Sequence, residues 1–186
     1  FIEKCLVNNV IALIDEAYFH FYGKTIIPWI KKYDNLIVTR TFSKAFGIAS
    51  LRLGYIAACE NIIENIIKVR QTYDANGIAV FFANRLLNNY HLVEQQIKSE
   101  KEGKKYLKQE LDKLDIPNVT GYTNCILIHC PKNKYHIVNE LKIRKILVRD
   151  HPDDQELLGE YIRVTTGSKL KMKKFLIAFK DILAKI

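Results

Sequence analysis

Short apolar runs of strand length alternate with segments of helical periodicity along the first half of the chain. Continuous apolar runs of this kind are typical of strands buried in parallel sheets. The pattern predicts strands at Val10–Ile14, Leu36–Thr39 and Arg52–Ala58. It predicts helices over residues 1–8, 25–33 and 60–70 and, after a polar break around Tyr73–Gly77, an apolar helix that runs to about Leu87. Strands that alternate with helices indicate an α/β fold with a mostly parallel sheet.

A long charged segment, His91–Leu114, begins the second half. Its apolar residues are sparse and roughly helical in spacing, which predicts a surface or connecting helix that Pro117 ends. After it, the pattern predicts strands at Thr123–His129, Ile146–Arg149 and Tyr161–Thr165, and helices over residues 134–144 and Ser168–Leu183. We therefore expect two domains. Residues 1–90 would be part of a mostly parallel-sheet large domain, and residues 91–186 a smaller C-terminal α+β domain.

Composition and net charge exclude few classes of function. The 186 residues are 48% apolar and carry a net charge of +9, which is spread over both halves. Basic charge attracts nucleic acid, but the chain has no recognised nucleic-acid-binding motif, so a non-enzymatic nucleic-acid-binding domain is a remote alternative. No apolar run approaches about 18 residues, and the first residues show neither a basic leader nor a sustained apolar core. We therefore expect no membrane span and no signal peptide.

Cysteines and histidines show no metal-binding spacing. The four cysteines, Cys5, Cys59, Cys125 and Cys130, form no Cys-x-x-Cys pair, and the five histidines are scattered. This arrangement predicts buried or incidental reduced thiols in a cytoplasmic protein and no metal site, with metal ligation by the cysteines as a remote alternative.

Chemically versatile side chains follow the first two predicted strands directly. Asp15-Glu-Ala-Tyr18 follows the first strand, and Thr41-Phe-Ser-Lys44 follows the second, with Arg52 eight residues after the lysine. These are the groups that a pyridoxal phosphate site requires. Lys44 would form the Schiff base with the cofactor. Asp15 would pair with the protonated pyridine nitrogen, and Tyr18 would reach the phenolic oxygen of the ring.

The remaining cofactor contact would be made to the phosphate. Thr41 and Ser43 can donate single hydrogen bonds, and the Arg52 guanidinium offers a fork that matches phosphate oxygens. Each residue also has a structural interpretation, with the hydroxyls stabilising turns and the arginine lying on the surface. We expect Glu16 to be structural or to face solvent.

Four segments together carry a resemblance to a known family. They are Asp15-Glu-Ala-Tyr18, Thr41-Phe-Ser-Lys-Ala-Phe-Gly47, Leu51-Arg-Leu-Gly54 and Tyr161-Ile-Arg-Val-Thr-Thr-Gly167. In this order they resemble the fold-type I pyridoxal-phosphate-dependent aminotransferases of class I/II, and within these the histidinol-phosphate aminotransferases. The chain looks like the C-terminal half of that family. The other half would supply the aromatic residue that stacks on the cofactor ring and further phosphate contacts.

The resemblance also implies how substrate is bound. Arg163, in a predicted strand between Ile162 and Val164, corresponds to the arginine that binds the carboxylate of the amino-acid substrate. A structural ion pair is the alternative for Arg163, because an arginine in such a strand needs a partner. Arg149 corresponds to a second substrate-facing arginine, suited to a substrate that carries a phosphate. The alternative for Arg149 is neutralisation by the neighbouring Asp150.

The function implied is that of a cytoplasmic, homodimeric transaminase with a ping-pong mechanism. It would move an amino group from an amino acid, glutamate by resemblance, to a keto acceptor that can be phosphorylated. A pyridoxal-phosphate-dependent decarboxylase of a phosphorylated serine- or threonine-type amino acid remains an alternative. A further hypothesis is that this chain alone cannot hold the cofactor and aggregates. The reason would be that residues 1–90 expose apolar sheet surface. Cooperative thermal unfolding of this chain as a monomer would contradict the hypothesis.

Overall fold

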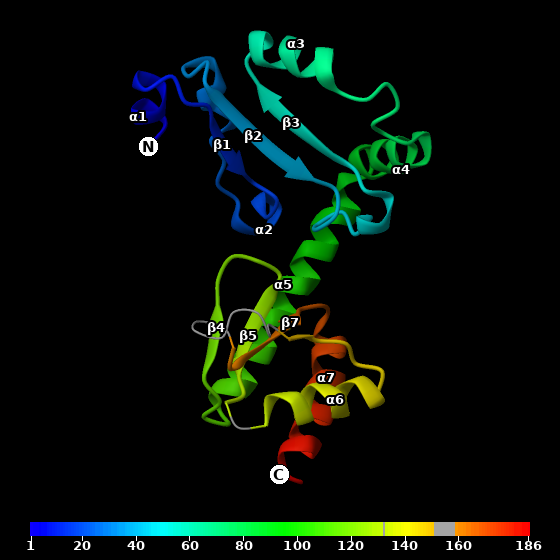
Figure 1. The fold of residues 1–186 in the computed structure, drawn as a ribbon. Coiled ribbons are helices and arrows are strands. Elements are labelled where there is room, and N and C mark those ends of the chain that lie inside the picture. The colour runs from blue at the N-terminus through cyan, green and yellow to red at the C-terminus, as the bar shows by residue number, and fades with distance from the viewer. Residues whose placement is uncertain (132, 151–158) are drawn as a thin grey trace. The chain divides into compact units, whose positions relative to one another are not determined.

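The computed structural model describes residues 1–131, 133–150 and 159–186, and the chain forms two compact units, Phe1–Glu94 and Gln95–Ile186 (Figure 1). The first unit contains helices α1 (Ile2–Val7), α2 (Phe19–Tyr22), α3 (Glu60–Val69) and α4 (Gly77–Asn88), strands β1 (Ala12–Asp15), β2 (Leu36–Thr41) and β3 (Gly54–Ala58), and 3-10 turns η1 (Ile27–Lys31) and η2 (Ala49–Leu51). Helix α5 (Tyr90–Asp112) begins in this unit and continues into the second.

The first unit is built on a three-stranded sheet in the order β1-β2-β3. β1 and β2 are parallel, with Asp15 opposite Thr39, whereas β2 and β3 are antiparallel. The antiparallel pairing follows from the connection between the two strands, because residues 42–53 contain only the short turn η2 and no helix that could return the chain for a parallel strand. The α/β class is confirmed, and this change of direction is the detail that the apolar pattern did not predict.

The prediction of a fully buried first strand is wrong. β1 starts at Ala12 rather than Val10, and Val10, Ile11 and Leu13 are about half exposed, at 49%, 58% and 58%. The small core that α1 and η1 complete covers one face of β1, the face that carries Ala12 and Ile14. The helix predicted over residues 25–33 is the 3-10 turn η1, with Pro28 in its first turn.

The second unit is an antiparallel sheet packed against helices, as an α+β fold requires. The sheet has the order β4-β5-β7-β6, with β4 at Asn118–Thr120, β5 at Cys125–His129, β6 at Arg149–Asp150 and β7 at Tyr161–Thr165. Helices α6 (Lys134–Ile143) and α7 (Lys169–Leu183) join α5 around the core. The pattern predicted β7 with its observed bounds and missed β4, whose three residues are too few for an alternation to be recognised.

Alternation along β5 and β7 fixes which side chains leave the core. Ile126 and Ile128 of β5, and Ile162 and Val164 of β7, are buried against the helices. Arg163 lies between two core residues and therefore belongs to the opposite face of the sheet. Ser168 caps α7 as predicted, since its hydroxyl accepts a hydrogen bond from the Lys171 N–H at 3.4 Å.

No helix in the described part of the chain combines the length and the apolar character needed to cross a membrane.

Candidate active site

Four of the predicted site residues lie at or just beyond the carboxyl ends of two parallel strands in the first unit. Asp15 is the last residue of β1, and Thr41, the last residue of β2, leads into the loop that carries Lys44. Because β1 and β2 are parallel, both segments leave the sheet at the same edge, where open α/β sheets bind ligands. The Lys44 ammonium nitrogen lies 5.3 Å from the centre of the Tyr18 ring. The structure therefore brings together the lysine, the tyrosine and the strand end that bears the aspartate.

The Asp15 carboxylate is exposed and held from one side only. Its Oδ1 accepts hydrogen bonds from the Ala17 N–H at 2.9 Å and from the Thr39 hydroxyl at 3.3 Å. Oδ2 has no hydrogen-bond partner among the residues that the structure describes, so it can accept a hydrogen bond from a ligand. Thr39 was not predicted as a site residue. Its role follows from the register, which places it directly opposite Asp15.

The loop after β2 holds Lys44 by burying its apolar neighbours. Phe42, Ala45 and Phe46 are buried, whereas Lys44 itself is half-buried. The Lys44 carbonyl accepts a hydrogen bond from the Gly47 N–H at 3.0 Å, and Gly47 adopts φ +71°, a conformation that suits glycine. The lysine thus sits on a tight turn that is anchored on both sides.

The two hydroxyls of this loop have different surroundings. The Thr41 hydroxyl accepts a hydrogen bond from the Ser43 N–H at 3.0 Å and donates one to the Leu53 carbonyl at 3.4 Å. These bonds match the turn-stabilising interpretation of Thr41. The Ser43 hydroxyl makes no hydrogen bond within the described residues and can donate to an anion.

Arg52 occupies a strained backbone position beside this loop. It has φ +55°, which is uncommon for a residue with a side chain, and its guanidinium donates to the Ala49 carbonyl at 2.9 Å. Arg52 is exposed and has no carboxylate partner within the parts of the chain that are described. Strain of this kind, retained by a charged residue where glycine would fit, points to a functional constraint.

Replacing Arg52 with glycine is expected to separate stability from cofactor binding. Glycine relieves the left-handed strain, so the melting temperature should stay unchanged or rise, because the cost removed is about 1 kcal/mol. The affinity for pyridoxal phosphate should fall by at least about tenfold, because a charged hydrogen bond to the phosphate is lost. Thermal melting and fluorescence titration with the cofactor measure the two effects. A melting temperature that falls together with the affinity would contradict the assignment.

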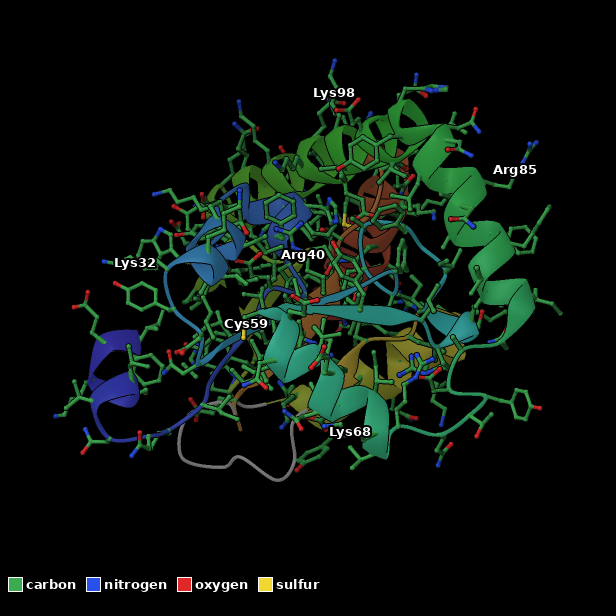
Figure 2. All side chains as sticks on the ribbon, turned by 90° about the horizontal axis from the view of Figure 1, so that it is seen from above. Lys32, Arg40, Cys59, Lys68, Arg85 and Lys98 are labelled. Atoms are coloured by element: carbon green, nitrogen blue, oxygen red, sulfur yellow. The ribbon has the colours of Figure 1, made fainter. Side chains whose placement is uncertain are left out.

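A buried ion pair links the segments that carry the candidate site residues. The sequence pattern did not predict it. Arg40 donates to Glu16 Oε2 from Nε at 3.1 Å and from Nη2 at 2.9 Å, and both side chains are about nine-tenths buried. Thr25 also donates to Glu16, and the guanidinium stacks on the Phe19 ring at 3.6 Å. Arg40 lies among the other side chains in Figure 2, whereas Lys32 and Arg85 extend outward. Glu16 is therefore structural, one of the two roles expected for it.

An aromatic cavity of about 530 Å³ lies beside this ion pair, within the first unit. His20 lines it, with Nδ1 2.9 Å from the Tyr90 hydroxyl and its ring edge-on to Phe46. Burial lowers the pKa of His20, and the neighbouring Arg40 charge lowers it further. The neutral imidazole is therefore favoured in this cavity.

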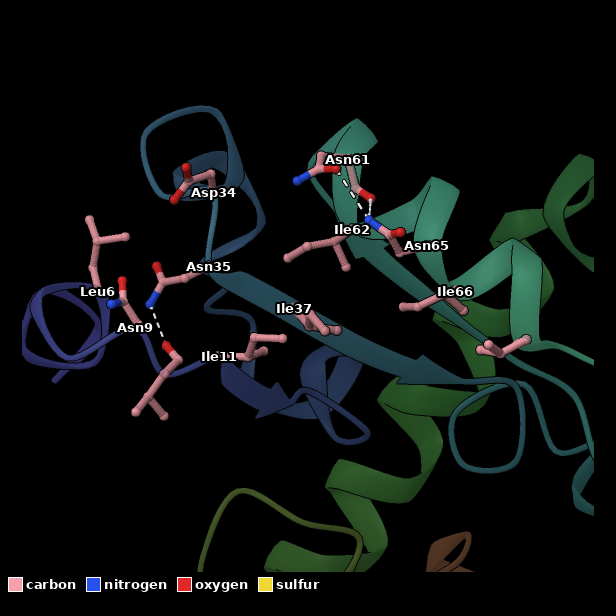
Figure 3. Close-up of a pocket in the computed structure, with 12 residues that line it drawn as sticks. Leu6, Asn9, Ile11, Asp34, Asn35, Ile37, Asn61, Ile62, Asn65 and Ile66 are labelled. Carbon is pink, nitrogen blue, oxygen red and sulfur yellow. Dashed lines mark hydrogen bonds between the residues drawn. The ribbon is translucent and has the colours of Figure 1, made fainter.

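A second cavity of the first unit, of about 560 Å³, lies at the opposite ends of the strands (Figure 3). Isoleucines from β2 and α3 form its apolar wall, and asparagines, among them Asn35 and Asn65, line it as well. None of the predicted site residues lines it. The cofactor prediction therefore concerns the carboxyl ends of β1 and β2 and not this groove.

In the second unit, the two predicted substrate arginines face each other. Arg149 of β6 is the register partner of Arg163 of β7, so their side chains share one face of the antiparallel pair. Neither has an ion-pair partner within the described residues. Asp150, the residue that could instead neutralise Arg149, pairs with the buried Lys134 at 2.7 Å. Two like charges placed opposite each other favour a bound anion.

Comparison with known proteins identifies the family. The sequence profile of the family described as aminotransferase class I and II matches residues 1–179. The chain belongs to this family. A histidinol-phosphate aminotransferase of Thermoanaerobacter sp. (strain X514) is 40% identical over 164 residues, which cover 87% of this chain and 45% of the relative. The chain spans about half the length of the curated relatives that it matches.

Solved structures of this fold include both candidate chemistries. Histidinol-phosphate aminotransferase from Sinorhizobium meliloti, in complex with pyridoxal-5'-phosphate, aligns with a TM-score of 0.85 and 21% identity, over 98% of this chain and 51% of that one. L-threonine-O-3-phosphate decarboxylase from Porphyromonas gingivalis aligns with a TM-score of 0.81 and 23% identity, over 98% and 58%. At these identities the likeness shows the fold, which is the fold-type I architecture expected for the family.

Proposed function

We propose that the protein containing this chain is a pyridoxal-phosphate-dependent aminotransferase of the histidinol-phosphate aminotransferase type. The observation that carries the proposal is the placement of Lys44 beside Tyr18, at the sheet edge where β1 ends in Asp15. Membership of the aminotransferase class I and II family and the 40% identical relative support the same activity. Glutamate is the proposed amino donor, and the proposed acceptor is a keto compound that carries a phosphate.

The residues present fit the cofactor. Asp15 offers a carboxylate oxygen that has no hydrogen-bond partner among the described residues, which suits a protonated pyridine nitrogen. Ser43 and Arg52 offer hydrogen-bond donors to a phosphate, and the Tyr18 hydroxyl can donate to the ring oxygen. When bound, pyridoxal phosphate supplies an electron sink for the carbanion of the substrate. Lys44 is proposed to hold the cofactor covalently and then, as a free amine, to carry the substrate's α-proton on Nζ.

Anionic groups on the two substrates would satisfy the paired arginines. We assign the carboxylate of the amino donor to Arg163, whose fork matches it with two hydrogen bonds. Arg149, opposite it on the same face, would take a second anion such as a phosphate. A phosphorylated substrate would thereby relieve the repulsion between the two guanidinium groups.

The decarboxylase alternative uses the same cofactor residues. The phosphothreonine decarboxylase neighbour favours it, since its fold matches this chain almost as well as the aminotransferase fold does. The two reactions differ in their products. Only a decarboxylase releases carbon dioxide, and only a transaminase requires a keto acceptor.

We also propose a cytoplasmic homodimer. Burial raises the pKa of the Cys130 thiol to about 12, and the four cysteines are free, which suits a reducing compartment. Helix α4 exposes large apolar side chains, including Ile78, Phe81 and Phe82, that a second copy or the remainder of the protein would cover. These exposed groups also support the hypothesis that the isolated chain aggregates.

A paired substrate assay tests the function. The complete protein is incubated with histidinol phosphate and 2-oxoglutarate, and separately with phosphothreonine, and glutamate and carbon dioxide are measured. We expect glutamate to form and no carbon dioxide to be released. The assay runs the reversible transfer in the direction in which histidinol phosphate gives the amino group. In Arg149→Gln, the KM for histidinol phosphate should rise by about 10- to 100-fold, because a charged hydrogen bond is lost. Carbon dioxide from phosphothreonine without glutamate formation would establish the decarboxylase instead.

A further inference from the structure

Helix α5 contains one glycine, at a position where the helix backbone touches another segment. Gly103 is buried in the middle of α5, where a glycine costs up to about 1 kcal/mol relative to alanine. A β-carbon added to it would overlap the Gly167 carbonyl oxygen and would lie 2.9 Å from the Ser168 carbonyl carbon. The absence of a side chain therefore permits the contact between α5 and the turn that follows β7.

The same face of α5 also holds a second turn. Lys104 donates from Nζ to the Gly121 carbonyl at 2.6 Å and to the Thr123 carbonyl at 2.5 Å. Glu100, one helical turn before Lys104, accepts from the Asn124 amide at 3.5 Å. We call Glu100, Gly103 and Lys104 the α5 contact face. It touches the turn before β5 and the turn after β7.

These two turns are bonded to each other. Thr166 is 5% exposed, and it donates to the Asn124 carbonyl from its N–H at 2.8 Å and from its hydroxyl at 3.1 Å. Arg163 lies three residues before Thr166 on β7, on the sheet face opposite the core. Since β7 is fixed at its end by Thr166 and Gly167, a displacement of the Gly167 turn would displace the Arg163 guanidinium as well.

We infer that Gly103 is a positioning residue for the substrate carboxylate, because it lets α5 contact the Gly167 carbonyl and so fixes the strand that carries Arg163. The inference rests on the proposed function for the role of Arg163. A displacement of about 1 Å at a substrate-binding group can lower the rate up to about 100-fold.

The test compares Gly103→Ala with Gly121→Ala in the complete protein. Gly121 lies in the other turn of this unit, and a β-carbon there has open space, so Gly121→Ala is a matched control. In Gly103→Ala, we expect the KM for glutamate to rise by about 10- to 100-fold with a smaller change in kcat. Cofactor affinity should stay unchanged, because the cofactor contacts lie in the first unit. Well below the melting temperature, a general loss of stability would not raise the KM for glutamate while leaving kcat and cofactor affinity almost unchanged.

A second readout does not depend on activity. Hydrogen exchange of the Thr166 and Arg163 backbone amides should be faster in Gly103→Ala and unchanged in Gly121→Ala. If Gly103→Ala does not fold, Lys104→Met takes its place. It removes the two bonds to the other turn, and the KM should rise by about fivefold.

Two results would overturn the inference. The first is an unchanged KM for glutamate and unchanged exchange in the Gly103 variant, or in Lys104→Met where that variant is used. The second is an equal effect of Gly121→Ala. If the wild-type protein transfers no amino group at all, the proposed function fails, while faster exchange at Thr166 would still support the contact.

Discussion

Lys44→Ala is expected to lower kcat by about 10⁴-fold, the largest effect of any single substitution in this chain. The substitution removes both the nucleophile that holds the cofactor and the base that moves the α-proton. Lys44 lies against Tyr18 on a loop anchored by Phe42 and Phe46, and no ion pair within the described residues depends on it. The fold should therefore survive, with a melting temperature close to that of the wild type.

Steady-state kinetics with glutamate measures this loss. Lys68→Ala is the matched control, since Lys68 is an exposed lysine of α3 whose one hydrogen bond within the described part of the chain goes to Asn65 at 3.1 Å. Its kcat should be unchanged. Lys44→Ala activity above about one tenth of the wild-type value would contradict the role assigned to this lysine.

Arg40→Met is expected to cost about 3–5 kcal/mol of unfolding free energy, the largest stability effect that we predict. The substitution leaves the Glu16 carboxylate buried without its charge partner, and the desolvation cost of that charge is no longer offset. It also removes the stacking contact with Phe19 and the hydrogen bond from Nη2 to Thr25. Because typical domains are stable by about 5–15 kcal/mol, this loss is a large fraction of the total.

Urea denaturation of the complete protein tests the ion pair. Arg85→Met, at an exposed position of α4, is the control and should change stability by less than about 0.5 kcal/mol. The double variant Glu16→Met, Arg40→Met should be more stable than Arg40→Met, because it leaves no unpaired buried charge. A cost below about 1 kcal/mol for Arg40→Met would show that the pair behaves as a solvent-exposed one.

The sequence pattern predicted where the candidate site residues lie, and it missed the residues that support them. Asp15, Tyr18 and Lys44 follow strand-like runs, and parallel strands bring such positions to one edge. Glu16 and Arg40 had a usable signal, since an arginine in a strand needs a partner, the argument applied to Arg163. Thr39 had none, because its role depends on the register between two strands.

The pattern of apolar and polar residues could not predict how far each side chain is buried or which backbone segments touch. Val10, Ile11 and Leu13 are apolar but about half exposed in this chain. Hydrophobicity shows which side chains can be covered and not what covers them. Gly103 sits in a charged helical segment, where a glycine predicts only a weaker helix. Its contact with Gly167 joins residues 64 positions apart, and local periodicity carries no information about such a pair.

The most direct test of the proposed function is an absorbance titration of the complete protein with pyridoxal phosphate, followed by borohydride reduction and peptide mapping. The wild-type protein should gain a visible band that shifts when glutamate is added, and reduction should fix the cofactor on the peptide that contains Lys44. Lys44→Ala should gain no such band. A band that persists in Lys44→Ala, or a cofactor fixed on a different lysine, would contradict the account.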